Sequence, residues 1–343
     1  MTDVAGINPA GVRAWLADRD AVHGELAFSM IEGGRSNLTY TVADESGVRW
    51  VLRRPPLHSV LESAHDMGRE ARIIAALADT AVPVPGVLGF EQDDAVTGAP
   101  FYVMRFVNGM VIRDEPDAAM IPQAVRGTIA STMISVLGAL HAIDPASVGL
   151  DDLGRHTGYI ERQLRRWKGQ LDTGAKRDLP LMHDIHARLA TNVPKQQGVA
   201  IVHGDYRLDN MIVGTAGTIE AVLDWELCTL GDPLADLGLL SVYWFDPDDE
   251  PIGVVGTPTR LDGFPRRAIL PSLYAKQTDR DLSELPYYVA FGLWKLSAIL
   301  EGVATRYEAG AYGEEAADAL KALWGVIDRL TDRAIEATEE AGR

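Results

Sequence analysis

The chain has 343 residues, 47% of them hydrophobic, and a formal net charge of −17, which is enough length to bury sizeable cores in one large or two modest domains. Because phosphate binding needs clustered Lys and Arg, this acidic balance excludes nucleic acid as an expected partner. The lone Cys228 excludes an internal disulfide and fits a cytoplasmic protein, and the sequence shows neither a secretory signal nor an apolar run suited to a membrane.

The first third of the chain predicts a small sheet with one main helix. A first helix is expected at residues 9–17, where Asn8 can cap it and Pro9 suits its first position. Apolar alternation and intervening glycine-containing turns predict strands at residues 25–32, 38–43, 48–53, 87–91 and 101–107. Apolar residues at helical spacing place the main helix at residues 67–78.

The remainder of the chain is predicted to be mostly helical. Amphipathic spacing predicts helices at residues 121–142, 159–171, 182–191, 234–242, 266–274, 284–306 and 313–340. Residues 244–260 are rich in Pro, Gly and Asp, and this composition predicts a surface loop at the mouth of a substrate site.

Residues 201–226 carry the clearest functional pattern. Short apolar runs predict buried strands here, at residues 199–202, 211–213 and 219–223. Asp205 follows the first strand, Asn210 precedes the second and Asp224 follows the third. Phosphoryl transfer uses these groups in this order, because a carboxylate accepts the hydroxyl proton while an amide oxygen and a second carboxylate hold Mg²⁺. Each residue alone is common in turns, but the joint pattern predicts a phosphotransfer site.

Three runs of this region, HGDYRLDN (203–210), LDWE (223–226) and GDPLADLG (231–238), resemble the aminoglycoside phosphotransferase family. That family is similar to choline kinases and has the protein-kinase fold. The resemblance implies an α+β, two-lobed structure, with a small antiparallel sheet in an N-lobe at 1–107 and a mostly helical C-lobe at 108–343.

The resemblance also implies roles for particular residues. Asp205 matches the family's catalytic base, with Arg207 beside it as a second catalytic candidate, and Asn210 and Asp224 match its magnesium ligands. The candidates for ATP binding lie in the glycine-rich loop, the third strand, the main helix and the connector between the lobes: Gly34, Ser36, Asn37, Arg53, Glu70, Met104, Phe106 and Val107.

Some of these assignments compete with plainer readings. Arg53 stands where protein kinases have a Lys, and some relatives, such as choline kinases, also have an Arg at this position. Glu70 is the expected ion-pair partner of Arg53. Arg53 and Arg54 could instead be a solvated pair at a strand end, although alternation places them on opposite faces. Met104 could be ordinary core.

Several further residues are expected to support the site. The family pattern suggests that Asp236 accepts hydrogen bonds from the catalytic-loop backbone and that His203 orients the loop, while His141 is expected to be structural. Residues that could face the acceptor are Trp244, Glu301 and Arg306.

The sequence therefore predicts an ATP- and Mg²⁺-dependent phosphotransferase acting on a hydroxyl of a small molecule. GGRSNLTY, VLRRPP and HGDYRLDN look most like the branch associated with acyl-CoA dehydrogenases, which makes a hydroxylated acyl compound one candidate acceptor. Aminoglycosides, other antibiotics, choline-like alcohols and sugars stay open, as does the oligomeric state. A catalytically silent nucleotide-binding protein and a protein kinase are the alternatives, the latter disfavoured because no activation segment ending in Ala-Pro-Glu is recognisable.

Overall fold

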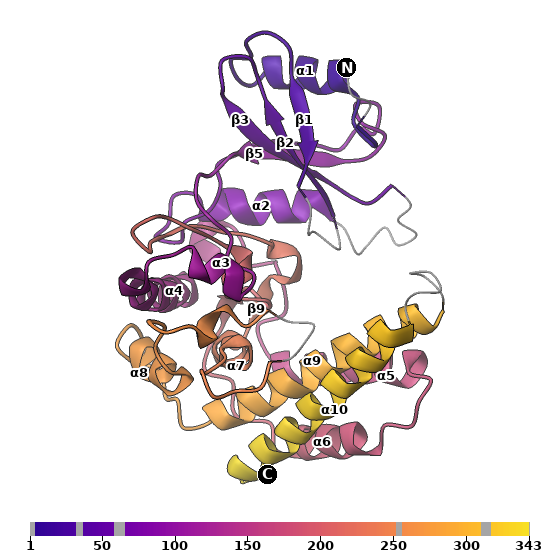
Figure 1. Ribbon diagram of the computed structural model, residues 1–343, viewed down its shortest axis with the longest axis vertical. Coiled ribbons are helices and arrows are strands. Elements are labelled where there is room, and N and C mark those ends of the chain that lie inside the picture. The colour runs from indigo at the N-terminus through magenta and orange to yellow at the C-terminus, as the bar shows by residue number, and fades with distance from the viewer. Residues whose placement is uncertain (1–3, 32–36, 58–65, 252–255, 310–316, 343) are drawn as a thin grey trace. The chain divides into compact units, whose positions relative to one another are not determined.

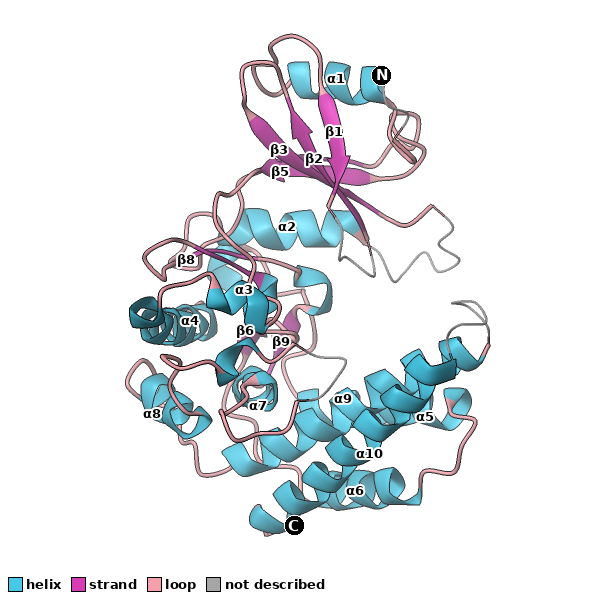
Figure 2. Cartoon of the chain, viewed as in Figure 1, coloured by secondary structure: helices cyan, strands magenta, loops and turns pink. Residues whose placement is uncertain are grey.

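A computed structural model describes residues 4–31, 37–57, 66–251, 256–309 and 317–342. The chain folds into two compact units (Figure 1). Unit 1 consists of Met1–Gly109 and Glu220–Glu226, and unit 2 of Met110–Ile219 and Leu227–Arg343. Figure 2 shows that unit 1 is built on a β-sheet, whereas helices make up most of unit 2.

Unit 1 contains an antiparallel five-stranded sheet in the order β1-β2-β3-β5-β4. Its strands are β1 (Ala27–Met30), β2 (Leu38–Ala43), β3 (Arg49–Arg54), β4 (Val87–Glu91) and β5 (Phe101–Arg105), and its helices are α1 (Pro9–Ala17) and α2 (Met67–Leu77). Both helices begin at a side-chain cap: Asn8 accepts from the Gly11 N–H, and Asp66 accepts from the Arg69 N–H.

The sheet separates its side chains by alternation, with α1 and α2 on opposite sides of it (Figure 1). Trp50 and Leu52 of β3 pack with Phe101 and Val103 of β5 in a core that also contains Trp15 of α1. Residues between them in sequence turn to the α2 side. This alternation decides where the charged residues at the end of β3 go.

Unit 2 contains the remaining helices and short strands. The helices are α3 (Glu115–Ala119), α4 (Gln123–Ala142), α5 (Tyr159–Gly174), α6 (Pro180–Thr191), α7 (Leu234–Tyr243), α8 (Leu270–Ala275), α9 (Leu285–Glu308) and α10 (Ala317–Glu340). The strands are β6 (Ala200–Val202), β7 (Met211–Val213), β8 (Ile219–Val222), whose last residues belong to unit 1, and β9 (Thr229–Gly231), and β6 pairs antiparallel with β9. Helix α9 packs against α7, α5 and α10 at the centre of the unit.

The structure differs from the sequence prediction in several places. The strand β9 was not predicted, because it is very short and its pairing with β6 is set by tertiary contacts. The chain was expected to turn helical from Pro116, and the short α3 stands there, ahead of the predicted helix at 121–142. The predicted helix at 266–274 is a 3-10 turn, Arg267–Ile269, followed by the shorter α8. The prediction of a surface loop at 244–260 is wrong at both ends, since Trp244 and Thr259 are buried. Within the part of the chain that the structure describes, no helix is both long and apolar enough to cross a membrane.

Candidate active site

The loop between β6 and β7 holds the Asp205 carboxylate in a fixed position. Its Oδ2 atom accepts a hydrogen bond of 2.9 Å from Nδ2 of Asn210 and lies 3.2 Å from Nε of Arg207. The same amide nitrogen donates to the backbone oxygen of Asp205, also at 2.9 Å, and Arg207 pairs with Asp209 at 3.0 Å. The side chain of Asp205 is 22% exposed. The structure thus brings together Asp205, Arg207 and Asn210 with one carboxylate fixed but still reachable.

Asp236, a buried residue of α7, anchors this loop through hydrogen bonds to its backbone. The Asp236 carboxylate accepts the backbone N–H groups of His203 (2.7 Å) and Gly204 (2.8 Å). Its Oδ2 atom also lies 3.3 Å from Nε2 of His141, whose Nδ1 atom is 2.8 Å from the Tyr274 hydroxyl. The predicted support by Asp236 and the structural role of His141 are therefore confirmed. Burial alone would raise the pKa of Asp236, but His141 and the Gly204 N–H hold that pKa below its ordinary value.

In unit 1 the side chains of the two arginines at the end of β3 lie on opposite faces of the sheet. Arg53 turns to the α2 side, where its Nη2 atom lies 2.9 Å from Oδ1 of Asp224 and its Nε atom 3.5 Å from Oε2 of Glu70. Arg54 is buried on the other face and donates to the backbone oxygens of Gly6 and Thr97. The predicted ion pair between Arg53 and Glu70 is therefore present, and a solvated arginine pair is not.

Glu70 is the centre of a buried polar cluster. Only 2% of its surface is exposed, and its carboxylate accepts from the Tyr102 hydroxyl (3.0 Å) and from Nδ2 of Asn37 (3.3 Å). Burial raises the pKa of Glu70, although Arg53 acts against that shift. Burial also opposes the charge of Arg53, but Tyr102, Glu70 and Asp224 outweigh it and raise the pKa of Arg53. Because two hydrogen bonds fix the Glu70 carboxylate, its ion pair with Arg53 holds the guanidinium in place.

Asp224 has an unusual backbone conformation. Its φ angle of 64° lies in the left-handed region, which no other non-glycine among the described residues adopts. The next residue, Trp225, is fully buried and donates from Nε1 to the backbone oxygen of Val222 at 3.1 Å. Such a conformation persists where neighbouring contacts over-determine it, and it is common at functional sites. The turn leaves the Asp224 side chain 32% exposed.

The other predicted nucleotide-binding residues are spread over unit 1. Met104 is buried in β5, and β5 ends at Arg105, so Phe106 and Val107 follow the strand and are half-buried. The guanidinium of Arg49 lies over the Phe106 ring at 3.8 Å. Oδ1 of Asn37 is buried and has no hydrogen-bond partner among the described residues. Gly34 and Ser36 lie outside the described residues.

The metal candidates belong to different units, Asn210 to unit 2 and Asp224 to unit 1. In the ranges that the structure describes, no group of three or more His, Cys, Asp or Glu gathers in the manner of a metal site. Each of the two side chains carries an oxygen of the hard type that Mg²⁺ prefers, and Mg²⁺ keeps several of its waters when bound. Since Nδ2 of Asn210 is engaged by Asp205, its Oδ1 atom is the one left for a cation.

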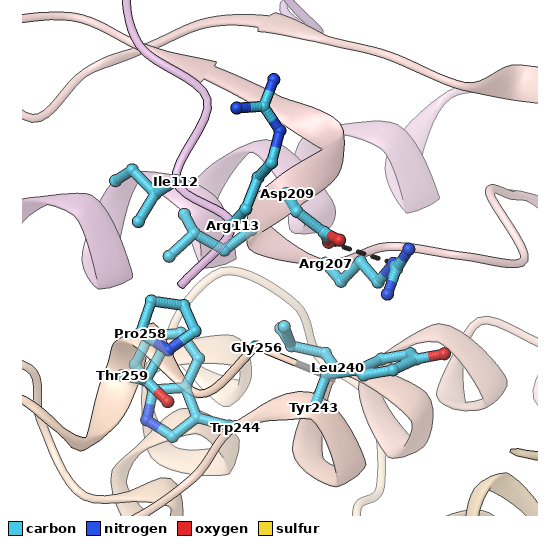
Figure 3. A pocket seen from close by; sticks show the side chains of 11 residues that line it. Ile112, Arg113, Arg207, Asp209, Leu240, Tyr243, Trp244, Gly256, Pro258 and Thr259 are labelled. Atoms are coloured by element: carbon cyan, nitrogen blue, oxygen red, sulfur yellow. Dashed lines mark ion pairs between the residues drawn. The ribbon is translucent and has the colours of Figure 1, made fainter. Parts of the chain in front are cut away.

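A small pocket of about 20 Å³ lies beside the β6–β7 loop in unit 2, and Trp244, Pro258 and Thr259 of the predicted 244–260 loop line part of it. Figure 3 shows Arg207 and Asp209 pointing toward one another at one side of it, and Trp244, Pro258 and Thr259 at the other. Its lining is largely apolar and includes Ile112, Leu208, Leu240, Tyr243, Trp244 and Pro258. Of the predicted acceptor-facing residues, Trp244 lines this pocket. Glu301 instead is buried against Arg177 at 3.0 Å, and Arg306 is exposed on α9.

Comparisons with known proteins identify the family. The model of the phosphotransferase enzyme family matches residues 28–268. This chain belongs to that family. A crystal structure from Ralstonia eutropha, of a candidate aminoglycoside phosphotransferase, is 30% identical and has a TM-score of 0.82 over 97% of this chain and 98% of that one. Choline kinase from Cryptosporidium parvum shares the fold, with 12% identity and a TM-score of 0.64 over 92% of this chain and 89% of that one.

Among curated proteins, chicken acyl-CoA dehydrogenase family member 11 is 32% identical over 325 residues, which cover 92% of this chain and 41% of the relative. The chain spans less than half the length of the curated relatives it matches. The expected family, its acyl-CoA-dehydrogenase-associated branch and the kinase-like α+β class with a small antiparallel sheet are therefore confirmed.

Proposed function

We propose that this phosphotransferase moves the γ-phosphate of ATP, with Mg²⁺, to a hydroxyl group of a small molecule. The observation that carries the proposal is the Asp205 carboxylate, held by Asn210 and Arg207 in a loop anchored through Asp236. A fixed, partly exposed carboxylate can receive a proton from an acceptor hydroxyl, as phosphoryl transfer requires.

In the proposed step the acceptor oxygen forms a bond to the γ-phosphorus while the bond from that phosphorus to the bridging oxygen of ADP breaks. The hydroxyl proton passes to the Asp205 carboxylate. Asn210 and Arg207 both contact Oδ2 of Asp205, so they orient the carboxylate during this transfer. Positioning accounts for much of the rate of such reactions, because little covalent chemistry is left for the protein.

The proposed nucleotide contacts come mainly from unit 1. Arg53 neutralises phosphate charge, and Glu70 fixes Arg53 in place. Asn210 and Asp224 would hold Mg²⁺, which when bound supplies positive charge against the phosphates. Contacts to the phosphates from Gly34, Ser36 and Asn37, and contacts to the adenine from Met104, Phe106 and Val107, complete this part of the proposal.

Arg53→Met should raise the KM for ATP by about 10- to 100-fold, because a charge-assisted contact contributes about 1.5–3 kcal/mol and each 1.4 kcal/mol is tenfold. Arg54→Met is the matched control. Its guanidinium binds backbone oxygens on the other face of the sheet, so this variant should lose thermal stability but keep a normal KM. Steady-state kinetics on variants shown to be folded by circular dichroism would decide, and equal KM values for the two variants would remove Arg53 from the site.

For the acceptor we propose a hydroxylated acyl compound. The pocket beside Asp209 and Arg207 is too small to enclose an acceptor, but its largely apolar lining suits contact with a hydrocarbon segment better than contact with a polycationic aminoglycoside. The relationship to acyl-CoA dehydrogenase family members points the same way. The pocket is lined by Arg207, Leu208 and Asp209 of the loop that carries Asp205, so an apolar segment resting against it would have its hydroxyl near the carboxylate.

A panel of acceptors tests the whole proposal. Hydroxylated acyl-CoAs, free hydroxy acids, aminoglycosides, amino alcohols, sugars and peptides would be mixed with ATP and Mg²⁺, and phosphorylated products detected by mass spectrometry. We expect transfer to a hydroxylated acyl compound. Transfer to peptides would instead favour a protein kinase, and nucleotide binding without any transfer would favour a catalytically silent protein. If ATP did not bind at all, the proposal would be wrong.

A further inference from the structure

The ammonium group of Lys295 is buried at the centre of unit 2, next to the catalytic loop. Lys295 lies in the middle of α9 and is only 5% exposed, although lysine is rarely buried without a partner. Its Nζ atom donates to the backbone oxygen of Gly204 at 3.0 Å and lies 5.9 Å from the centre of the Trp167 ring. This long cationic side chain thus donates a hydrogen bond to the backbone carbonyl of the residue immediately before Asp205.

The peptide unit that Lys295 contacts is the one that leads into the proposed base. Gly204 donates its own N–H to Asp236, and its φ angle is +83°. The following N–H, that of Asp205, donates to Nδ1 of His203 at 3.2 Å. The oxygen and the N–H of the Gly204–Asp205 peptide are therefore both fixed, the oxygen by Lys295 and the N–H by His203. Rotation of this peptide would swing the Asp205 side chain away from its present direction.

The charges around Lys295 explain how the ammonium is tolerated. Burial lowers its pKa, and Arg166 of α5 acts in the same direction, whereas the negative charges of Asp205 and of Asp236 on α7 oppose the shift. Asp236 accepts the N–H of Gly204, and Asp205 is the next residue of the loop. The ammonium therefore interacts with the proposed base through space as well as through the backbone.

From this geometry we propose that Lys295 is a positioning residue for phosphoryl transfer, which fixes the peptide before Asp205 and so aims the base. The inference rests on the proposed function, since Asp205 matters here as the proton acceptor. It assigns a part in the reaction to helix α9, which lies far from the catalytic loop in sequence and carries no motif. Lys295 itself touches neither nucleotide nor acceptor in this proposal.

The test uses the full chain and compares Lys295→Met, which keeps the length of the side chain but loses its charge and donor, with Lys295→Arg, which keeps both. We expect Lys295→Met to lower kcat by about 100-fold, the effect of a misplacement of about 1 Å, with the KM for ATP little changed. Lys295→Arg should recover most of kcat. Arg177→Met is the matched control, because Arg177 pairs with Glu301 on the same helix and with Asp328 of α10.

Hydrogen exchange of the amides at 203–206, followed by mass spectrometry, gives a readout that needs no acceptor. Lys295→Met should speed this exchange, whereas Arg177→Met should leave it unchanged while lowering the thermal midpoint. An unchanged kcat with unchanged exchange would overturn the inference, as would an equal loss of kcat in Arg177→Met. If no acceptor is ever found, the proposed function fails by itself, and the exchange data still decide whether Lys295 fixes the loop. Should Lys295→Met not fold, Lys295→Gln would take its place in both measurements.

Discussion

Asp205→Asn should lower kcat by about 10²- to 10⁴-fold, the range that a positioned general base contributes. Asparagine has nearly the same shape, and its oxygen can still accept the hydrogen bond from Asn210, so the loop should keep its conformation. The substituted group cannot take up the hydroxyl proton. Binding of ATP, for which the proposed contacts lie mainly in unit 1, should change little in isothermal titration calorimetry. Turnover would be measured with the acceptor that the panel identifies.

Asp209→Asn is the control for this variant. Asp209 lies in the same loop as Asp205, and its Oδ1 atom is 3.0 Å from Nε of Arg207, the atom that also contacts Asp205. If the loss of turnover in Asp205→Asn came only from the broken ion pair with Arg207, the two variants would behave alike. We expect the kcat of Asp209→Asn to stay within about tenfold of the wild type, since a partly exposed ion pair contributes about 1 kcal/mol, although the KM for the acceptor should rise because Asp209 lines the proposed acceptor pocket. Near-normal kcat in Asp205→Asn would rule out Asp205 as the base.

Much of this architecture could be predicted because local pattern and tertiary packing agree. β2, β4 and β7 have the predicted bounds, and α2 begins at Met67 as expected, behind the cap of Asp66. Alternation along β3 also predicted correctly that Arg53 and Arg54 lie on opposite faces. Elements that depend on distant partners were missed. The strand β9 forms because it pairs with β6, and the three residues Thr229–Gly231 are too short a stretch to show a strand pattern by themselves.

The motif residues of the site could be named from the sequence, but the contacts that position them could not. Tyr102 donates to Glu70, and only its place two residues from Met104 on the same face of β5 could have suggested it. Lys295 reaches Gly204 from a helix whose apolar pattern predicts nothing but burial. The left-handed backbone of Asp224 was not predicted either, although aspartate is among the residue types that adopt this conformation more often than most. Pattern therefore names the candidate groups, while side-chain packing decides how they are held.

Asp236→Asn should reduce the free energy of unfolding by about 1–3 kcal/mol at neutral pH, the usual cost of leaving a buried hydrogen-bond donor without an acceptor. His203 and Gly204 donate their N–H groups to different oxygens of the Asp236 carboxylate, and asparagine replaces one of these oxygens by an NH₂ group. One of the two N–H groups would therefore face a donor instead of an acceptor. The catalytic loop would lose its anchor, and kcat should fall with stability. Urea titrations at several pH values, with far-ultraviolet circular dichroism as the signal, would measure the effect.

The pH dependence of this loss separates a charge effect from a shape effect. The pKa of Asp236 is lower in the folded protein than its ordinary value of 3.8, so its stabilisation is present above that value and is lost as the pH falls through the folded pKa. The difference in free energy of unfolding between wild type and Asp236→Asn should therefore shrink in acid.

Asp232 offers the opposite case. It is buried and accepts a hydrogen bond of 2.7 Å from the Tyr288 hydroxyl, and burial raises its pKa. For Asp232→Asn the sign reverses, because a raised pKa gives stability that is lost as the pH rises, so the difference from wild type should grow in acid. Parallel slopes for the two variants would mean that neither carboxylate acts through its charge, and that the loop is held by packing alone.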